Sequence, residues 1–131
     1  MGVSKAWHVL YYETPTGHCP VQAFIDGTKT RDQAKILSWI HLLEVHGPTL
    51  PRPYADYLDA GIHELRIRLS GHRVRILYFF VFKRYIILSH AFSKTVAMVP
   101  AAEIQRAAKH RGEFMLRYDE KRILEVLNEK L

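Results

Sequence analysis

The sequence has few of the features that mark secreted, membrane-embedded or disulfide-linked proteins. Cys19 is the only cysteine among 131 residues, so no disulfide can form within the chain and a reducing cytoplasm is favoured. The most apolar run, ILYFFVF at 76–82, is too short for a membrane helix. The N-terminal residues lack a basic region followed by a sustained apolar run, so we expect no signal peptide. These absences predict a cytoplasmic protein without membrane contact.

Signatures of metal, cofactor or phosphate-loop chemistry are also missing. The eight histidines show no metal-ligand spacing, and a single cysteine adds no ligand set. No glycine-rich loop that could cradle a phosphate occurs in the sequence. We therefore expect a protein that uses neither a metal nor a cofactor.

Acidic residues are outnumbered by basic ones. The chain has 19 Lys and Arg against 13 Asp and Glu, a formal net charge of +6. Such an excess favours a polyanionic partner, either nucleic acid or an acidic protein. A protein that is merely basic would have the same composition, so the positions of the charges must decide.

Apolar periodicity predicts a small α+β protein in which residues 1–131 form one domain. The expected elements are, in chain order, a strand at 7–13, helices at 20–26 and 30–46, strands at 62–70, 73–82 and 85–93, a helix from about Pro100, and a helix at 119–131. Short connections between the last three strands predict an antiparallel sheet. Thr30 and Gln33 have the spacing of a capping box, and three prolines at 48–54 predict an extended loop.

The stretch HELRIRLSGHRVR at 63–75 alternates arginines with apolar residues on two neighbouring strands. A two-residue turn at Gly71-His72 would pair Arg68 with Arg75 and would keep all the arginines on one face of the hairpin. A three-residue turn would mix charged and apolar residues on both faces. We therefore predict the two-residue register.

The following hairpin adds a third strand to this face. With Lys83-Arg84 as the connection, Arg73 pairs with Lys94 and Leu77 pairs with His90. One end of the face then collects six basic side chains: Arg66, Arg68, Arg73, Arg75, His90 and Lys94. The other end is apolar, with Phe79, Val81, Ile86 and Leu88. That apolar end must be covered by the C-terminal helices or by a partner.

Like charges directly opposite in a sheet cost a few tenths to about 1 kcal/mol per pair, and Glu64 is the main acid nearby. A phosphate would offset this repulsion, because arginine binds phosphate through two parallel hydrogen bonds. The alternative is a solvated face whose arginines splay outward and pair with Asp or Glu from the loops. We favour the anion site, since the charges come from three strands instead of one run.

The same segments resemble the RelE/ParE toxins of bacterial type II toxin–antitoxin modules, and are most similar to the phage-derived, HigB-like branch. The similar segments are GIHELRIRL (61–69), HRVRILYFF (72–80), IILSHAFSK (86–94) and PAAEIQRA (100–107). Their order and spacing carry the resemblance, which spans about residues 5–115. The C-terminal helical extension, about 118–131, exceeds the common family core and would cover the apolar half of the face or occupy an antitoxin site.

The resemblance implies a RelE-like, microbial-RNase-type fold, with two N-terminal helices on one face of an antiparallel sheet, the active site on the other face, and helices at the C-terminus. Many RelE-type toxins cleave mRNA in the ribosomal A site without a metal, by attack of a ribose 2′-hydroxyl on the adjacent phosphate. We therefore expect a toxin with endoribonuclease activity that inhibits translation. Its expected partners are a cognate antitoxin, mRNA and the ribosome.

The resemblance also assigns roles to basic residues of the predicted face. Arg66, Arg68 and Arg73 would position and stabilise the phosphate, and Lys94 would give electrostatic support or act as an acid. His90 is a candidate general acid or base on chemical grounds, because the unperturbed pKa of histidine is about 6.5. The neighbouring cations should lower that pKa and favour the neutral imidazole. Arg75, His72 and Arg84 are expected to bind nucleic acid. Thr95 to Met98 stand where HigB-like toxins usually carry further basic residues, which weakens the phosphate grip of this loop. Two alternatives stay open: a RelE-fold binding protein without catalysis, and a ParE-like toxin directed at gyrase.

Overall fold

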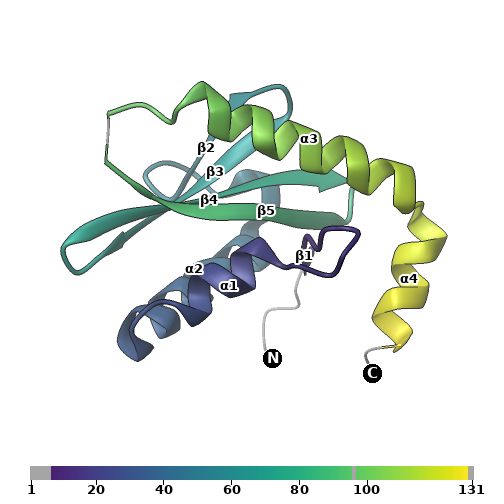
Figure 1. Cartoon of the computed structure of the whole chain (residues 1–131), viewed down its shortest axis with the longest axis horizontal. Helices are drawn as coiled ribbons and strands as arrows, with labels where there is room; N and C mark the ends of the chain where they lie inside the picture. The colour runs from purple at the N-terminus through teal and green to yellow at the C-terminus, as the bar shows by residue number, and fades with distance from the viewer. Residues whose placement is uncertain (1–6, 96, 130–131) are drawn as a thin grey trace.

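A mostly antiparallel sheet forms the middle of the protein (Figure 1). The computed structural model describes residues 7–95 and 97–129. The strands are β1 (His8–Tyr11), β2 (Ala55–Asp59), β3 (Ile62–Leu69), β4 (His72–Val81) and β5 (Tyr85–Lys94), in the order β1-β5-β4-β3-β2. Only the β1–β5 pair among these strands is parallel. This architecture confirms the predicted α+β, RelE-like fold.

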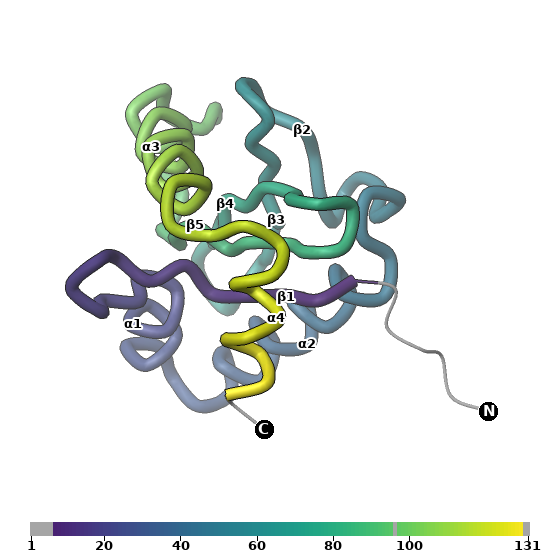
Figure 2. The backbone as a smooth tube through the Cα atoms, turned by 90° about the vertical axis from the view of Figure 1, so that its right-hand side faces the viewer, coloured from purple at the N-terminus to yellow at the C-terminus, as the bar shows by residue number. Residues whose placement is uncertain are grey.

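Helices cover both faces of the sheet (Figures 1 and 2). The helices are α1 (Pro20–Asp26), α2 (Thr30–His46), the short 3-10 helix η1 (Gly47–Thr49), α3 (Ala101–Arg117) and α4 (Glu120–Glu129). Helices α1 and α2 lie against one face, and α3 runs back across the other. None of the helices in the described ranges is long and apolar enough to cross a membrane.

Helix α2 forms where its apolar spacing predicts, but it begins differently. Its buried side chains Ile36, Ile40 and Leu43 repeat at helical spacing. The predicted capping box is absent, because Lys29 is the N-cap residue and no side chain caps the helix there. The Gln33 side chain donates instead to the carbonyl oxygen of Thr28. The capping-box prediction is therefore wrong: the N-cap residue is Lys29, one residue before the predicted Thr30, and it has no capping side chain.

The proline-rich segment after α2 contains structure that the sequence did not reveal. It begins with the 3-10 helix η1 instead of an extended chain, and it leads into β2. Strand β2 has two aspartates in five residues, a composition that disfavours strands. It forms because it pairs with β3, with a register irregularity between Tyr57 and Asp59.

The β3–β4 register differs from the prediction by two residues. The turn is Ser70-Gly71, one residue earlier than predicted, so Arg75 pairs with Arg66 and not with Arg68. Gly71 has φ 82° at the second turn position, a conformation that glycine adopts without steric cost. Because the shift is even, the arginines stay on the predicted face while each acquires a different partner.

The β4–β5 register is as predicted at the basic end of the sheet. Arg73 pairs with Lys94 and Leu77 pairs with His90. The connection nevertheless has three residues, because Val81 pairs with Tyr85, whereas an even number was expected. A bulge on β5 adds one unpaired residue to this odd connection, and the predicted pairing is restored beyond the bulge.

The bulge inverts the faces of the first half of β5. The extra residue, Ser89, lies opposite the step between two consecutive residues of β4, and one inserted residue turns every following side chain to the opposite face. Ile86 and Leu88 therefore join the core beneath α1 and α2, so the prediction that placed them at the apolar end of the arginine face is wrong. Tyr85 and Ile87 take their place.

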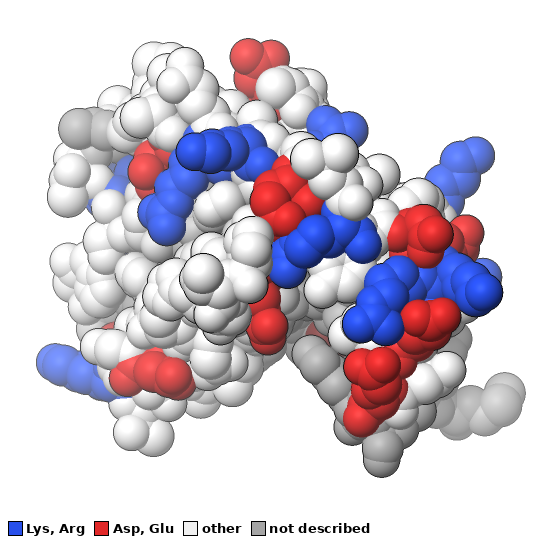
Figure 3. All heavy atoms as spheres, turned by 45° about the vertical axis from the view of Figure 1, so that its right-hand side comes forward, with Lys and Arg blue, Asp and Glu red and all other residues white. Residues whose placement is uncertain are grey.

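The apolar half of the arginine face is covered by the C-terminal helices. Ala107 and Phe114 of α3 and Ile123 of α4 are buried against Phe79 and Leu77 of β4. This outcome confirms one of the two predicted ways of covering that half. Over α4, acidic and basic side chains lie next to one another (Figure 3).

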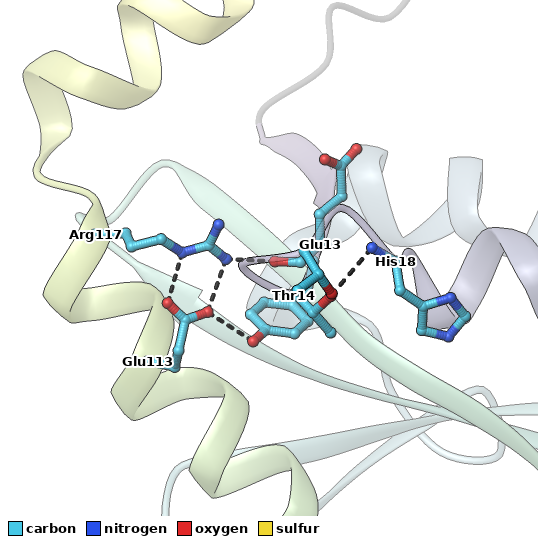
Figure 4. A network of polar contacts seen from close by, with 7 residues as sticks. Glu13, Thr14, His18, Glu113 and Arg117 are labelled. Carbon is cyan, nitrogen blue, oxygen red and sulfur yellow. Dashed lines mark hydrogen bonds and ion pairs between the residues drawn. The ribbon is translucent and has the colours of Figure 1, made fainter.

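A polar network ties the end of α3 to the chain after β1 (Figure 4). The Tyr12 hydroxyl donates to Glu113 Oε1 at 2.6 Å. Arg117 donates to Glu113 Oε1 at 2.7 Å and also to the carbonyl oxygen of Glu13. These contacts hold the C-terminal end of α3 against the β1 side of the sheet, where α4 begins.

Candidate functional site

Five of the predicted basic residues lie together at the end of the arginine face. We call Arg66, Arg68, Arg73, Arg75 and Lys94 the basic cluster. Arg66 lies directly opposite Arg75, Arg68 opposite Arg73, and Arg73 opposite Lys94. Residues paired in this way have Cβ atoms about 4.5–5.5 Å apart. Three strands thus bring five cations into contact range of one ligand.

Exposure differs among the members of the basic cluster. Arg68 and Arg73 are exposed, while Arg66 and Lys94 are partly buried. Arg75 is only 3% exposed, and its Nη1 donates to the carbonyl oxygen of Val74. The outer arginines can therefore reach a ligand, while Arg75 adds positive charge from below.

Glu64 is the carboxylate that the structure places against this cluster. Its Oε1 lies 3.4 Å from Arg66 Nε and 3.5 Å from Arg75 Nε, and the residue is 4% exposed. The alternative prediction, in which the arginines pair with acidic residues, is thus partly confirmed. The acid is Glu64 of β3 and not a residue of the loops. One carboxylate cannot neutralise five cations, so the surface remains strongly positive.

The neighbouring cations act on Lys94. Burial, followed by repulsion from Arg75, lowers the pKa of Lys94, and Glu64 opposes that change. A lysine with a lowered pKa gives up its proton more readily, which suits a proton donor. Lys94 is therefore the member of the cluster best suited to proton transfer.

A cavity of about 310 Å³ opens beside the cluster. Its charged lining residues are Asp56, Glu64, Arg66 and Lys94, and its apolar lining residues include Leu58, Met98 and Ile104. We call it the Glu64 cavity. Its size lies at the lower end of the range for small-molecule sites.

His90 lies close to the cluster in the sheet but has no contact with solvent. It is 0% exposed, its Nε2 lies 3.3 Å from Glu103 Oε2 on α3, and its Nδ1 lies 2.9 Å from Ser89 Oγ. Burial and then repulsion from Arg106 and His110 lower its pKa to about 3. The expected direction of the pKa change is confirmed, although burial is the largest cause. Its catalytic role stays a prediction.

The β5 bulge produces a buried polar contact that the sequence pattern did not indicate. Ser89 Oγ lies 2.9 Å from His90 Nδ1 and 2.8 Å from His110 Nδ1. One hydroxyl can donate to one of these rings and accept from the other. Tyr12 stacks on the His110 ring with 4.3 Å between the centroids. The apolar pattern of β5 gives no sign of a bulge. The only signal in the sequence for this contact is that Ser89 and His90 are adjacent.

His72 and Arg84 lie outside the basic cluster. His72 lines a different cavity of about 590 Å³, with Phe24 of α1, on the α1–α2 side of the sheet. Arg84 follows the far end of β4, and the eight-residue advance from Arg73 to Val81, at about 3.4 Å per residue, puts it roughly 27 Å from Arg73. Their binding of nucleic acid stays a prediction. No group of three or more potential metal ligands occurs in the ranges 7–95 and 97–129.

A comparison with known protein families covers the part of the chain that forms this site. The family described as phage derived protein Gp49-like (DUF891) matches residues 23–111, which include the whole basic cluster, Glu64 and most of α3. Strand β1 and helix α4 lie outside the match. No curated protein matches the chain. Gp49-like proteins are a RelE/toxin-like family. Since the match covers well over half of the sequence, the chain belongs to the phage-derived, Gp49-like family.

Proposed function

We propose that the protein is the toxin of a type II toxin–antitoxin module, of the HigB-like kind, and that it cleaves mRNA on the ribosome without a metal. It would act in the cytoplasm and be held inactive by a cognate antitoxin. The single observation that carries the proposal is the basic cluster, in which three strands combine five cations around one buried carboxylate. Membership of a RelE/toxin-like family supports it.

A phosphodiester fits the basic cluster better than water does. The paired arginines repel one another, at a cost of a few tenths to about 1 kcal/mol per pair. A phosphate between them would replace repulsion with charge-assisted hydrogen bonds. Because the exposed arginines are Arg68 and Arg73, we assign the first contact with the phosphate to these two side chains.

Cleavage by a ribose 2′-hydroxyl needs cations for the developing charge and an acid for the leaving oxygen. We assign the first task to Arg66, Arg68 and Arg73, with Arg75 adding positive charge beneath them. Lys94 would give its proton to the 5′ oxygen, because its pKa is lowered. Arginine is unsuited to this step, since it stays protonated in proteins.

His90 fits a proton-transfer role only if α3 moves. With α3 in place, the imidazole is buried against Glu103 and Ser89, and no substrate can touch it. Without such movement, His90 would act by holding β5 in register and so positioning Lys94, four residues further along. Either role predicts loss of activity when His90 is replaced.

A translation assay with mapping of mRNA breaks tests the proposal. Arg73→Ala should reduce cleavage of mRNA on the ribosome by about 10²–10³-fold, the usual effect of removing one group that stabilises developing charge. Arg122→Ala is the matched control, because Arg122 is an exposed arginine on α4 paired with Glu125. Intact mRNA in the presence of the unmodified protein would refute the ribonuclease assignment.

A binding protein without catalysis is the second candidate. The observation that favours it is the complete burial of His90, which keeps the predicted acid or base out of contact with substrate. Inhibited translation with intact mRNA and intact DNA would support this reading. DNA damage with intact mRNA would instead indicate a gyrase-directed toxin.

A further inference from the structure

The proposed reaction lacks a base for the 2′-hydroxyl. Arginine cannot serve, because it stays protonated. Lys94 is assigned to the opposite task of giving up a proton. His90 is buried beneath α3. A base must therefore come from another side chain that lines the same surface.

Glu64 is the carboxylate beside the reacting position. It lies on β3, two residues before Arg66, and its side chain is 6% exposed. Its Oε1 faces both Arg66 Nε and Arg75 Nε. Its Oε2 is buried and has no hydrogen-bond partner among residues 7–95 and 97–129. A buried acceptor without a partner is costly, so a small rotation of the Glu64 side chain into the cavity it lines, which lets a ligand donate to Oε2, would be favoured.

The two ion pairs of Glu64 leave it able to take on such a contact. Their distances of 3.4 and 3.5 Å exceed the roughly 2.7–2.9 Å of a charge-assisted N–H···O bond. A carboxylate that served only to bind these guanidinium groups would be expected to form shorter, two-pronged contacts. Glu64 instead faces the arginines through one oxygen and leaves the other unused.

The Glu64 cavity brings the required groups to one place. Glu64, Arg66 and Lys94 all line this space of about 310 Å³. The apolar lining residues, including Met98 and Ile104, offer a surface for a base or a ribose. A nucleotide seated there would have its phosphate beside Arg66 and Lys94 and its ribose beside Glu64.

Building on the ribonuclease function proposed above, we propose that Glu64 is the general base that removes the proton from the ribose 2′-hydroxyl. The proton passes from O2′ to the Glu64 carboxylate as the O2′–P bond forms. The P–O5′ bond breaks, and the Lys94 ammonium gives its proton to O5′. The products are a 2′,3′-cyclic phosphate and a 5′-hydroxyl end, and the protons balance with Glu64 protonated and Lys94 neutral.

The test compares Glu64→Gln with the unmodified protein in single-turnover cleavage of mRNA on programmed ribosomes. The variant keeps the shape of Glu64 and removes its basicity. Its rate constant should fall by about 10²–10⁴-fold, the usual contribution of a general base. Its affinity for a non-cleavable RNA with a 2′-deoxy nucleotide at the break should stay within a few-fold. Glu125→Gln, on α4 and outside the lining of this cavity, is the control and should keep full activity.

The possible outcomes separate the two proposals. If the unmodified protein leaves mRNA intact, the ribonuclease function fails. If it cleaves and Glu64→Gln cleaves within about threefold of it, the ribonuclease function stands and Glu64 is not the base. A parallel loss of rate and RNA affinity would also overturn the base assignment, because it would mean that Glu64 only positions Arg66 and Arg75. If Glu64→Gln does not fold, Glu64→Asp replaces it: withdrawing the carboxylate should lower the rate constant with affinity kept, and full activity would overturn the assignment.

Discussion

The strongest test of the packing around the basic cluster is a double-mutant cycle on Glu64 and Arg75. Both side chains are buried, with 6% and 4% of their area exposed, and they lie 3.5 Å apart. Glu64→Leu would leave the Arg75 guanidinium buried without its carboxylate. Breaking a buried pair in this way costs about 3–5 kcal/mol of unfolding free energy. Arg66 adds at most about 1 kcal/mol, because its side chain is 35% exposed to solvent.

Removing both charges should restore most of this loss. Glu64→Leu combined with Arg75→Met leaves apolar side chains of similar length and no uncompensated charge. Replacing a buried ion pair with apolar residues is often neutral or stabilising by about 1–4 kcal/mol. The double variant should therefore unfold at a urea concentration close to that of the unmodified protein, or higher.

Urea unfolding followed by circular dichroism measures all four corners of the cycle. The exposed pair of Arg52 and Asp56, 2.9 Å apart with 75% and 28% of their side chains exposed, is the control. Its coupling energy should be between zero and about 1 kcal/mol. Additive losses for Glu64→Leu and Arg75→Met, or a loss below about 1 kcal/mol for Glu64→Leu alone, would refute the view that Glu64 compensates Arg75.

Two further predictions concern pH and backbone conformation. The folded-state pKa of His90 is about 3 and the unfolded value about 6.5, so only the unfolded chain binds a proton in that range. The unfolding free energy should then decrease as the pH falls below about 6.5, by up to about 1.4 kcal/mol per pH unit from this group. In urea unfolding at pH 7 and pH 5, His90→Gln should lose less unfolding free energy between the two pH values than the unmodified protein does. An equal loss in both proteins would contradict the assigned pKa of His90. Gly47 has φ 53°, and an added Cβ would lie 2.2 Å from the Trp7 ring. Gly47→Ala should destabilise the protein by roughly 2–4 kcal/mol, and Gly17→Ala, which also has positive φ but meets nothing within 4 Å, by only about 1 kcal/mol.

Side-chain alternation was enough to predict the basic cluster. Its arginines occupy every second position of β3 and β4, and a strand turns successive side chains to opposite faces. The actual β3–β4 turn differs from the predicted one by two residues in register. An even shift leaves the faces unchanged, so the site survived an error in pairing. The β4–β5 prediction held at the same end because a three-residue connection and a one-residue bulge add up to an even number.

Other features depended on contacts that no local pattern records. Strand β2 forms from an unfavourable composition because β3 offers it a partner. The bulge at Ser89 is stabilised by His110, which lies 21 residues away on α3. Ile86 and Leu88 consequently occupy the face opposite to the predicted one. A sequence reading that assumes regular strands cannot find these positions, since the bulge inverts alternation without changing composition.

The sequence by itself determined which side chains of β3 and β4 share a face, because alternation along a regular strand is a local property of the backbone. The tertiary structure decided which of those side chains are neighbours and which are exposed. The actual β3–β4 register brings Glu64 diagonally beside Arg75, where the predicted one would have kept them apart. Packing of α3 against β5 buries His90. Pairing and burial depend on residues distant in the chain. Only the folded arrangement could therefore place the Glu64 carboxylate against Arg75 and bury the His90 imidazole.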